Sequence, residues 1–251
     1  MYGTISSIWC IILKSEVLFM ENKKTISPDD AMNHSGSMKN LIQLSFGEEV
    51  GNAITHGVMA VICLFLLPVA AIKAYLEGGA LQAAGTSIFI ISIFMMFLVS
   101  CLYHSMKYET PQKTIFRILD HCFIYVAIAG SYTPIALCII EGWQGLLILI
   151  LQWAMVLAGV LYKSIARRSY PKISVTIYLI MGWIAVLFIP LLLRKASAIF
   201  LALIVLGGIF YSIGTLFYKK QYNKKYYHMI WHFFINAGAI SHMIAIIFFL
   251  R

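Results

Sequence analysis

Two histidines lie one helical turn apart at the start of the last apolar stretch of the chain, residues 226–236. Residues at positions i and i+4 share one face of a helix, so His228 and His232 can direct two imidazole rings towards one point. Imidazole is a common ligand of zinc, but a tetrahedral zinc ion needs two further ligands. The pair alone is therefore compatible with a metal site and also with interfacial histidines that bind no ligand.

Further candidate ligands occur in two earlier apolar segments. Ser100 and His104 are again one helical turn apart at the end of one segment, and Asp120 lies near the start of the next. Of the ten carboxylates, Asp120 is the only one clearly inside an apolar segment. An unpaired charge at membrane depth is costly, so Asp120 needs a partner. That partner is either a neighbouring Ser, Tyr or His or a cation held nearby.

The composition is that of an integral membrane protein. Of 251 residues, 61% are hydrophobic and 12% are charged, whereas soluble domains carry about 25% charged residues. The formal net charge of +9 comes from short loops, where basic residues orient a membrane protein. We therefore expect a multi-pass protein of the plasma (inner) membrane with membrane lipid, and no nucleic acid, as its partner. The five cysteines are scattered singly and predict no disulfide framework.

The hydropathy pattern predicts an all-α membrane protein with seven transmembrane helices and no strands. Residues 1–45 are too polar to build a core, so we expect a disordered tail. Because Met20, Met32 and Met38 lie within this tail, the native start of the protein is left open. Residues 46–251 form the membrane domain. Its apolar segments have about the 20 residues that a bilayer requires, at 53–75, 81–103, 118–140, 145–162, 173–193, 198–218 and 229–250.

The basic residues predict how these helices are oriented. Fifteen of the 19 lysines and arginines lie in the tail and in the second, fourth and sixth loops, and four lie on the opposite side. The positive-inside rule then places the N-terminus in the cytoplasm and the C-terminus outside. This orientation is the reverse of that of a G-protein-coupled receptor, so seven helices do not imply that fold.

This topology brings the candidate ligands to one depth near the cytoplasmic face. His104 ends the second helix, Asp120 begins the third, and His228 and His232 begin the seventh. Three imidazoles with an open fourth position are typical of catalytic zinc, which lowers the pKa of a bound water to about 7. Magnesium and calcium prefer oxygen ligands and fit this set poorly.

Two other histidines, His56 and His242, lie in the predicted apolar segments. His56 lies one turn into the first helix at the same level, and is the first alternative ligand. His242 lies ten residues beyond His232, about 15 Å further along the helix. It is therefore too far away to share an ion with His232.

These residues together resemble the signature of the hemolysin III and progestin/adipoQ receptor (PAQR) family, with the bacterial hemolysin III branch as the nearer match. The motifs are Ser100-x-x-x-His104, the lone Asp120 and His228-x-x-x-His232, preceded by an opening motif over residues 49–56. The resemblance extends from about Phe46 to the end of the chain. It implies a Zn²⁺ ion held by the three histidines, with Asp120 reaching it through a water, Ser100 beside it, and kinship with ceramidase-type membrane hydrolases.

Three functions remain open at this stage. In the first, a zinc-dependent hydrolase cleaves an amide or ester of a lipid-like substrate: Asp120 takes the proton of the attacking water and Ser100 donates a hydrogen bond to the oxyanion. In the second, a pore-forming, cytolytic hemolysin uses zinc as a structural clamp. In the third, a PAQR-type receptor senses a ligand. No charged residue other than Asp120 is expected well inside a span, which weakly disfavours an ion-conducting pore.

The orientation can be tested with reporter fusions. A reporter active only in the cytoplasm should be active when fused after Lys225 and silent when fused after Arg251, because these positions flank the last predicted helix. The opposite pattern would invert the assigned depths and separate the candidate ligands from the cytoplasmic face.

Overall fold

The computed structural model describes residues 43–165, 171–221 and 224–250. Over these residues the chain is all-helical, without strands, and six helical stretches are long and apolar enough to cross a membrane; one of them, Ile173–Lys195, spans two of the α-helices given below. We therefore treat it as a multi-pass membrane protein. The α-helices are α3 (Phe46–Ser105), α4 (Pro111–Ile135), α5 (Gly142–Ile165), α6 (Pro171–Trp183), α7 (Ile189–Lys195), α8 (Ala198–Lys220) and α9 (Tyr227–Phe249).

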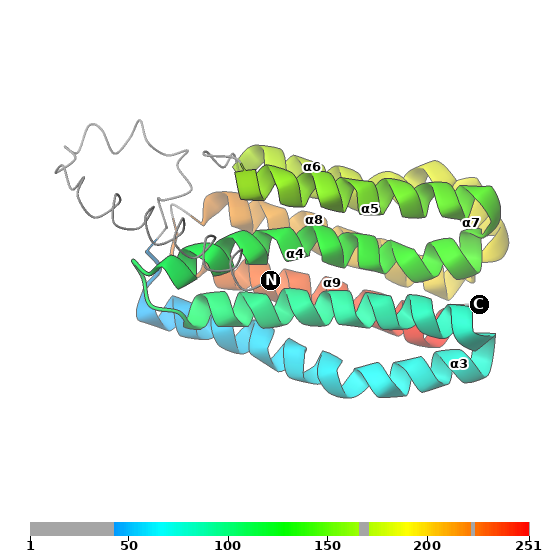
Figure 1. Cartoon of the computed structure of the whole chain (residues 1–251), viewed down its shortest axis with the longest axis horizontal. Coiled ribbons are helices and arrows are strands. Elements are labelled where there is room, and N and C mark those ends of the chain that lie inside the picture. The colour runs from blue at the N-terminus through cyan, green and yellow to red at the C-terminus, as the bar shows by residue number, and fades with distance from the viewer. Residues whose placement is uncertain (1–42, 166–170, 222–223, 251) are drawn as a thin grey trace, which may run out of the picture. The chain divides into compact units, whose positions relative to one another are not determined.

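The first two predicted segments form one helical stretch, α3, of 60 residues. A straight helix of this length would measure roughly 90 Å, three times the thickness of a bilayer core of about 30 Å. Gly79 interrupts it with φ 72° and ψ −165°, so that α3 consists of two helices joined at this residue. Figure 1 shows the chain reversing its direction there, at the right-hand end of the bundle. Six long helices are thus observed where seven separate segments were predicted.

Helices α3 and α4 begin earlier than the predicted segments. Ser45 caps α3 in a capping box with Glu48, and Thr110 caps α4 ahead of Pro111. Both first turns contain polar residues, which a hydropathy pattern excludes although capping chemistry favours them at a helix start. Hydropathy therefore located the lipid-immersed part of each helix and missed its first turns.

Prolines mark irregular backbone in two of the segments. Pro134 lies just before a π-helical turn, Ala136–Ile140, that prolongs α4. Pro190 lies in the first turn of α7, which follows a 3₁₀ turn over Ile184–Phe188. The predicted fifth helix is therefore divided into α6, the 3₁₀ turn and α7.

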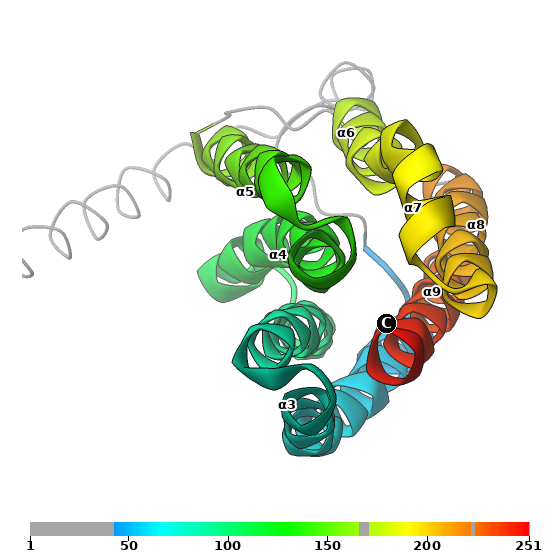
Figure 2. The same ribbon diagram turned by 90° about the vertical axis from the view of Figure 1, so that its right-hand side faces the viewer.

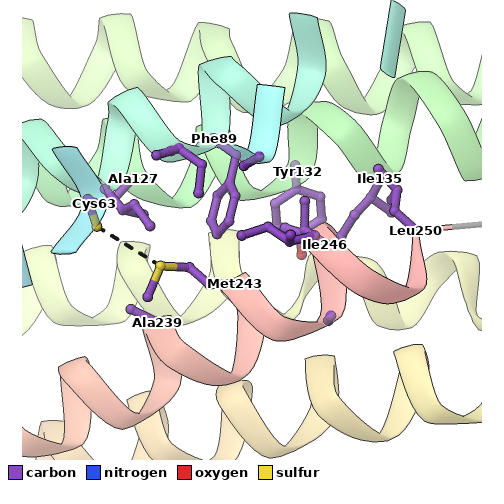
Figure 3. Packing of buried hydrophobic residues seen from close by; sticks show 14 of the residues in the cluster. Cys63, Phe89, Ala127, Tyr132, Ile135, Ala239, Met243, Ile246 and Leu250 are labelled. Atoms are coloured by element: carbon purple, nitrogen blue, oxygen red, sulfur yellow. Dashed lines mark hydrogen bonds between the residues drawn. The ribbon is translucent and has the colours of Figure 1, made fainter. Parts of the chain in front are cut away.

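The apolar core lies between α3, α4 and α9. Figure 3 shows Phe89 of α3 and Tyr132 of α4 beside Met243 and Ile246 of α9, and all four are buried. The Cys63 thiol lies 4.0 Å from the Met243 sulfur. Many large apolar side chains instead face outward, as expected of a surface in contact with lipid chains.

The helices pair in a way that brings distant parts of the chain together. Helix α3 packs against α4 and α9, and α9 packs against α8, as the end-on view in Figure 2 also shows. The start and end of α3, the start of α4 and the start of α9 all lie at one end of the bundle, on the left in Figure 1. The candidate ligands belong to this end.

The reversal at Gly79 can be tested by substitution. Only glycine adopts this combination of φ and ψ readily, so Gly79→Ala should destabilise the protein by about 1–3 kcal/mol and lower its melting temperature in detergent. Gly182→Ala is the matched control, since Gly182 lies in α6 with open space around its Cα and alanine favours a helix by ~0.5–1 kcal/mol. Equal melting temperatures for the two variants would contradict a strained reversal at Gly79.

Candidate metal centre

Three histidines from α3 and α9 form the one group in the described part of the chain whose side chains could jointly hold a metal ion. One ligand atom from each of His104, His228 and His232 lies within 4.8 Å of the others. The centroids of the His228 and His232 rings are 4.7 Å apart, and they lie 5.0 and 5.1 Å from the centroid of the His104 ring. His104 and His232 are only 3% and 0% exposed. The helical spacing of four thus places two rings of α9 against the last turn of α3.

The outer nitrogen of each ring is held by a hydrogen-bond acceptor. Nδ1 of His104 lies 2.5 Å from a carboxylate oxygen of Glu49, and Nδ1 of His228 contacts the amide oxygen of Gln221. An ionised carboxylate and an amide oxygen can only accept hydrogen bonds. Both rings therefore carry their proton on Nδ1.

The third ring is oriented in the same way by a hydroxyl group. Nδ1 of His232 lies 3.3 Å from Oγ1 of Thr55. This hydroxyl already donates its proton to the carbonyl of Asn52 at 2.9 Å, so it accepts from the imidazole. All three histidines then present the lone pair of Nε2 towards the group.

The Nε2 atoms are the reason to regard this group as a metal site. All three are buried and have no hydrogen-bond partner among the described residues. Buried polar atoms are rarely left unpaired, and each such atom calls for a water, an ion or a ligand. Three neutral imidazoles whose Nδ1 protons are held by outer acceptors match the donor set that zinc uses in proteins. Bonds of about 2.0–2.1 Å to zinc would draw the three atoms closer together.

Asp120 and Ser100 lie next to this group. The buried Asp120 lines a cavity of about 30 Å³ together with His104, His228 and Arg117. Ser100, also buried, is hydrogen-bonded through its side chain to Asp120. Asp120 itself is not part of the three-histidine group. The cavity is large enough to hold a water molecule, and an acid lines one side of it.

The other histidines have different surroundings. His56 stacks on His232 with parallel rings 3.6 Å apart and does not belong to the metal-binding group. His242 is hydrogen-bonded through Nε2 to the carbonyl of Ile204 at 3.2 Å. His121, next to Asp120, is hydrogen-bonded through Nδ1 to the carbonyl of Arg117 at 2.8 Å.

Sequence reasoning missed several residues that contact the site. Glu48 and Glu49 precede the first predicted apolar segment, so hydropathy did not predict that both are buried in the first turn of α3. Lys113 was assigned to a cytoplasmic loop, yet its side chain is fully buried in an ion pair with Glu49. One signal was available: Glu49, Asn52 and His56 follow each other at spacings of three and four residues, which indicates a polar face on the first turns of α3.

The chain is similar to a known protein family and to several known proteins. A family model described as "Haemolysin-III related" matches residues 44–243. The "Hemolysin-3 homolog" of Bacillus subtilis (strain 168) is 35% identical over 204 residues, which are 80% of this chain and 94% of that protein. "Hemolysin-3" of Bacillus cereus is 34% identical over 205 residues, 80% and 91% of the two chains. The human "Monocyte to macrophage differentiation factor" is 24% identical over 222 residues, 86% and 90% of the two chains.

The ligand set can be tested by metal analysis of the protein purified in detergent. Wild type should carry about one zinc per chain, and His104→Ala, His228→Ala and His232→Ala should each lose most of it, because two imidazoles hold zinc far less tightly than three. His242→Ala, a buried histidine with its own backbone partner, is the control and should keep the metal. Full occupancy in any two of the first three variants would exclude this ligand set.

Proposed function

The chain belongs to the haemolysin-III related family, and from this premise we propose that it is a zinc-dependent membrane hydrolase that cleaves an amide or ester bond of a lipid-like substrate. One observation carries the proposal: three buried Nε2 atoms face one another without partners beside a cavity lined by an acid. A purely structural group of histidines would not require a buried acid beside it in the same cavity.

In this proposal the residues divide the chemistry between them. His104, His228 and His232 would hold zinc, which would supply a Lewis acid for the substrate carbonyl and for a water. Asp120 accepts the proton of the attacking water at its carboxylate and later returns it to the leaving group. The Ser100 hydroxyl donates to the carboxylate of Asp120 and orients it before attack. When Asp120 takes the proton of the water, the hydroxyl is released and donates its one hydrogen bond to the developing oxyanion.

The surroundings of the cavity favour a substrate of lipid-like chemistry. The cavity of about 30 Å³ is lined by polar side chains, among them Asp120, His104 and Arg117, which suit the polar group of a substrate. The outer faces of the helices carry exposed apolar side chains, including Leu102 on α3 and Ile115 on α4 near the same end of the bundle. A substrate could therefore bring its polar scissile group to the cavity while its apolar chains stay in the membrane.

We also propose seven membrane crossings, with the metal centre at the cytoplasmic side. The length of α3 and its interruption at Gly79 support separate crossings by its two halves. The positive-inside bias of the sequence supports a cytoplasmic location for the end that carries the three histidines. In a bacterial cell this corresponds to the inner membrane.

The names of two relatives favour a second candidate function. "Hemolysin-3" and "Hemolysin-3 homolog" suggest a protein that perturbs membranes, in which zinc would only tie α3 to α9. For the PAQR branch, the corresponding function is that of a receptor in which zinc has only a structural role. In both cases Asp120 would have no role in chemistry, so this residue separates the proposals.

The decisive variant is Asp120→Asn, which keeps the size of the side chain and removes its charge. If Asp120 is the general base, the variant should retain zinc and lose turnover of a lipid-amide or lipid-ester substrate by ~100- to 10,000-fold, whereas His232→Ala should lose both. Glu141→Gln, which alters an exposed acid paired with Lys195, is the matched control and should behave like wild type.

Three outcomes would count against this assignment. Wild-type turnover by a zinc-loaded Asp120→Asn variant would exclude Asp120 as the base. Loss of zinc from that variant would make Asp120 a direct ligand. If zinc-loaded wild type cleaves no lipid amide or ester but releases dye from lipid vesicles, the membrane-perturbing function replaces the hydrolase.

A further inference from the structure

The first turn of α3 contains two adjacent buried acids whose partners lie on the elements that carry the metal-binding histidines. Glu48 is 5% exposed and Glu49 is 8% exposed. We propose that these are positioning residues: Glu49 fixes the ring of His104, and Glu48 fixes the start of α9 with its two histidines. The inference rests on the metal centre of the proposed function and adds the residues that assemble it.

Glu49 lies between a metal-binding histidine and a buried lysine. One of its oxygens accepts from Nδ1 of His104 at 2.5 Å, and the other accepts from Nζ of Lys113 at 2.7 Å. Lys113 also donates to the carbonyls of Tyr103 and Met106, at 3.3 and 3.1 Å. The ammonium group thereby joins the last turn of α3 to the first turn of α4 and holds the carboxylate against His104.

A tyrosine covers this ion pair from the connection between α3 and α4. The Tyr108 ring lies 4.1 Å from Nζ of Lys113, within the range of a cation–π contact. Its hydroxyl accepts from the backbone N–H of Leu44 at 2.7 Å and is hydrogen-bonded to Glu49. Partial burial, reinforced by that hydrogen bond, raises the pKa of Tyr108, so the phenol keeps its proton and can donate it to Glu49. Glu49 therefore has little freedom to turn away from His104.

Glu48 forms the equivalent link to α9. One oxygen caps its own helix by accepting from the backbone N–H and the hydroxyl of Ser45, at 3.0 and 2.7 Å. The other accepts from the backbone N–H of Tyr226 at 2.6 Å. Tyr226 is the residue directly before α9 and has a left-handed conformation with φ 62°, which is unfavourable for a tyrosine without such a contact. Glu48 thus fixes the point from which His228 and His232 project.

These contacts have a direct effect on a metal ligand. A carboxylate that accepts the Nδ1 proton selects the tautomer with a free Nε2 lone pair, orients the ring and makes Nε2 more basic. Removing such a partner typically weakens metal binding ~10- to 100-fold. Metal affinity should decrease from Glu to Gln to Ala at residue 49, because the glutamine amide still offers an acceptor oxygen whereas alanine offers none.

The tautomer of His104 gives a test that does not depend on metal or activity. In metal-free protein labelled with ¹⁵N-histidine, the ring signals of His104, identified by their loss in His104→Ala, should report a proton on Nδ1. Glu49→Ala should give a mixture of tautomers and Glu49→Gln an intermediate result. Glu48→Ala and the control Glu141→Ala should leave the His104 tautomer unchanged, because neither acid contacts this ring.

Zinc affinity, measured by competition with a chromophoric chelator, gives the second readout. Glu49→Ala and Glu48→Ala should each bind zinc ~10- to 100-fold more weakly, Glu49→Gln should lose less, and Glu141→Ala should match wild type. Should the alanine variants fail to fold, Glu49→Gln and Glu48→Gln, which keep the side-chain volume, give the same comparison on a smaller scale.

The outcomes distinguish this inference from the proposed function. An unchanged His104 tautomer in Glu49→Ala, or zinc affinities within twofold of wild type in the residue 48 and 49 variants, would overturn the positioning role. Failure of wild type to bind zinc would overturn the proposed metal-dependent function, while the tautomer measurement would still decide whether Glu49 fixes His104. Zinc binding without hydrolysis would leave the positioning role intact.

Discussion

A buried imidazole has two nitrogen atoms to satisfy, and this requirement organises one end of the helix bundle. Each of the three histidines uses Nδ1 to reach a different acceptor: one in the first turn of α3, one in its third turn, and one in the residue after α8. These three acceptors fix the rings from outside, so the three Nε2 atoms meet at the centre. The packing of α3 against α9 is thus matched to the hydrogen bonds that the histidines need.

The same constraint explains why charged side chains occur inside an apolar bundle. Lys113 and Glu49 are almost fully buried, yet every donor and acceptor contact shown for them is to a charged, aromatic or carbonyl group. In such surroundings an ion pair is strong, and removing one partner is costly, by about 3–5 kcal/mol. Their burial follows from the geometry of the site, because the lysine neutralises the acid that orients a ligand.

The sequence predicted the features that depend on local spacing. Helical periodicity placed His228 with His232 and Ser100 with His104, and hydropathy located the helices that carry them. The predicted topology brought these pairs to one depth, and the family resemblance, now confirmed, implied that they form one site. Individual side-chain contacts between distant segments could not be predicted. Thr55 lies 177 residues from His232, whose ring it contacts, and Lys113 has the sequence context of a loop lysine although it is paired with Glu49 in the structure. Hydropathy alone also could not show that polar first turns belong to α3 and α4.

The order of the helices along the chain has a consequence for biosynthesis. Two of the three histidines lie on α9, and the backbone N–H that Glu48 accepts from lies 178 residues after that acid. Chains grow from the N-terminus, so the acids of α3 are made long before these partners exist. The three-histidine group is therefore completed only once α9 has been made, and a nascent or truncated product that lacks α9 contains one histidine of the three.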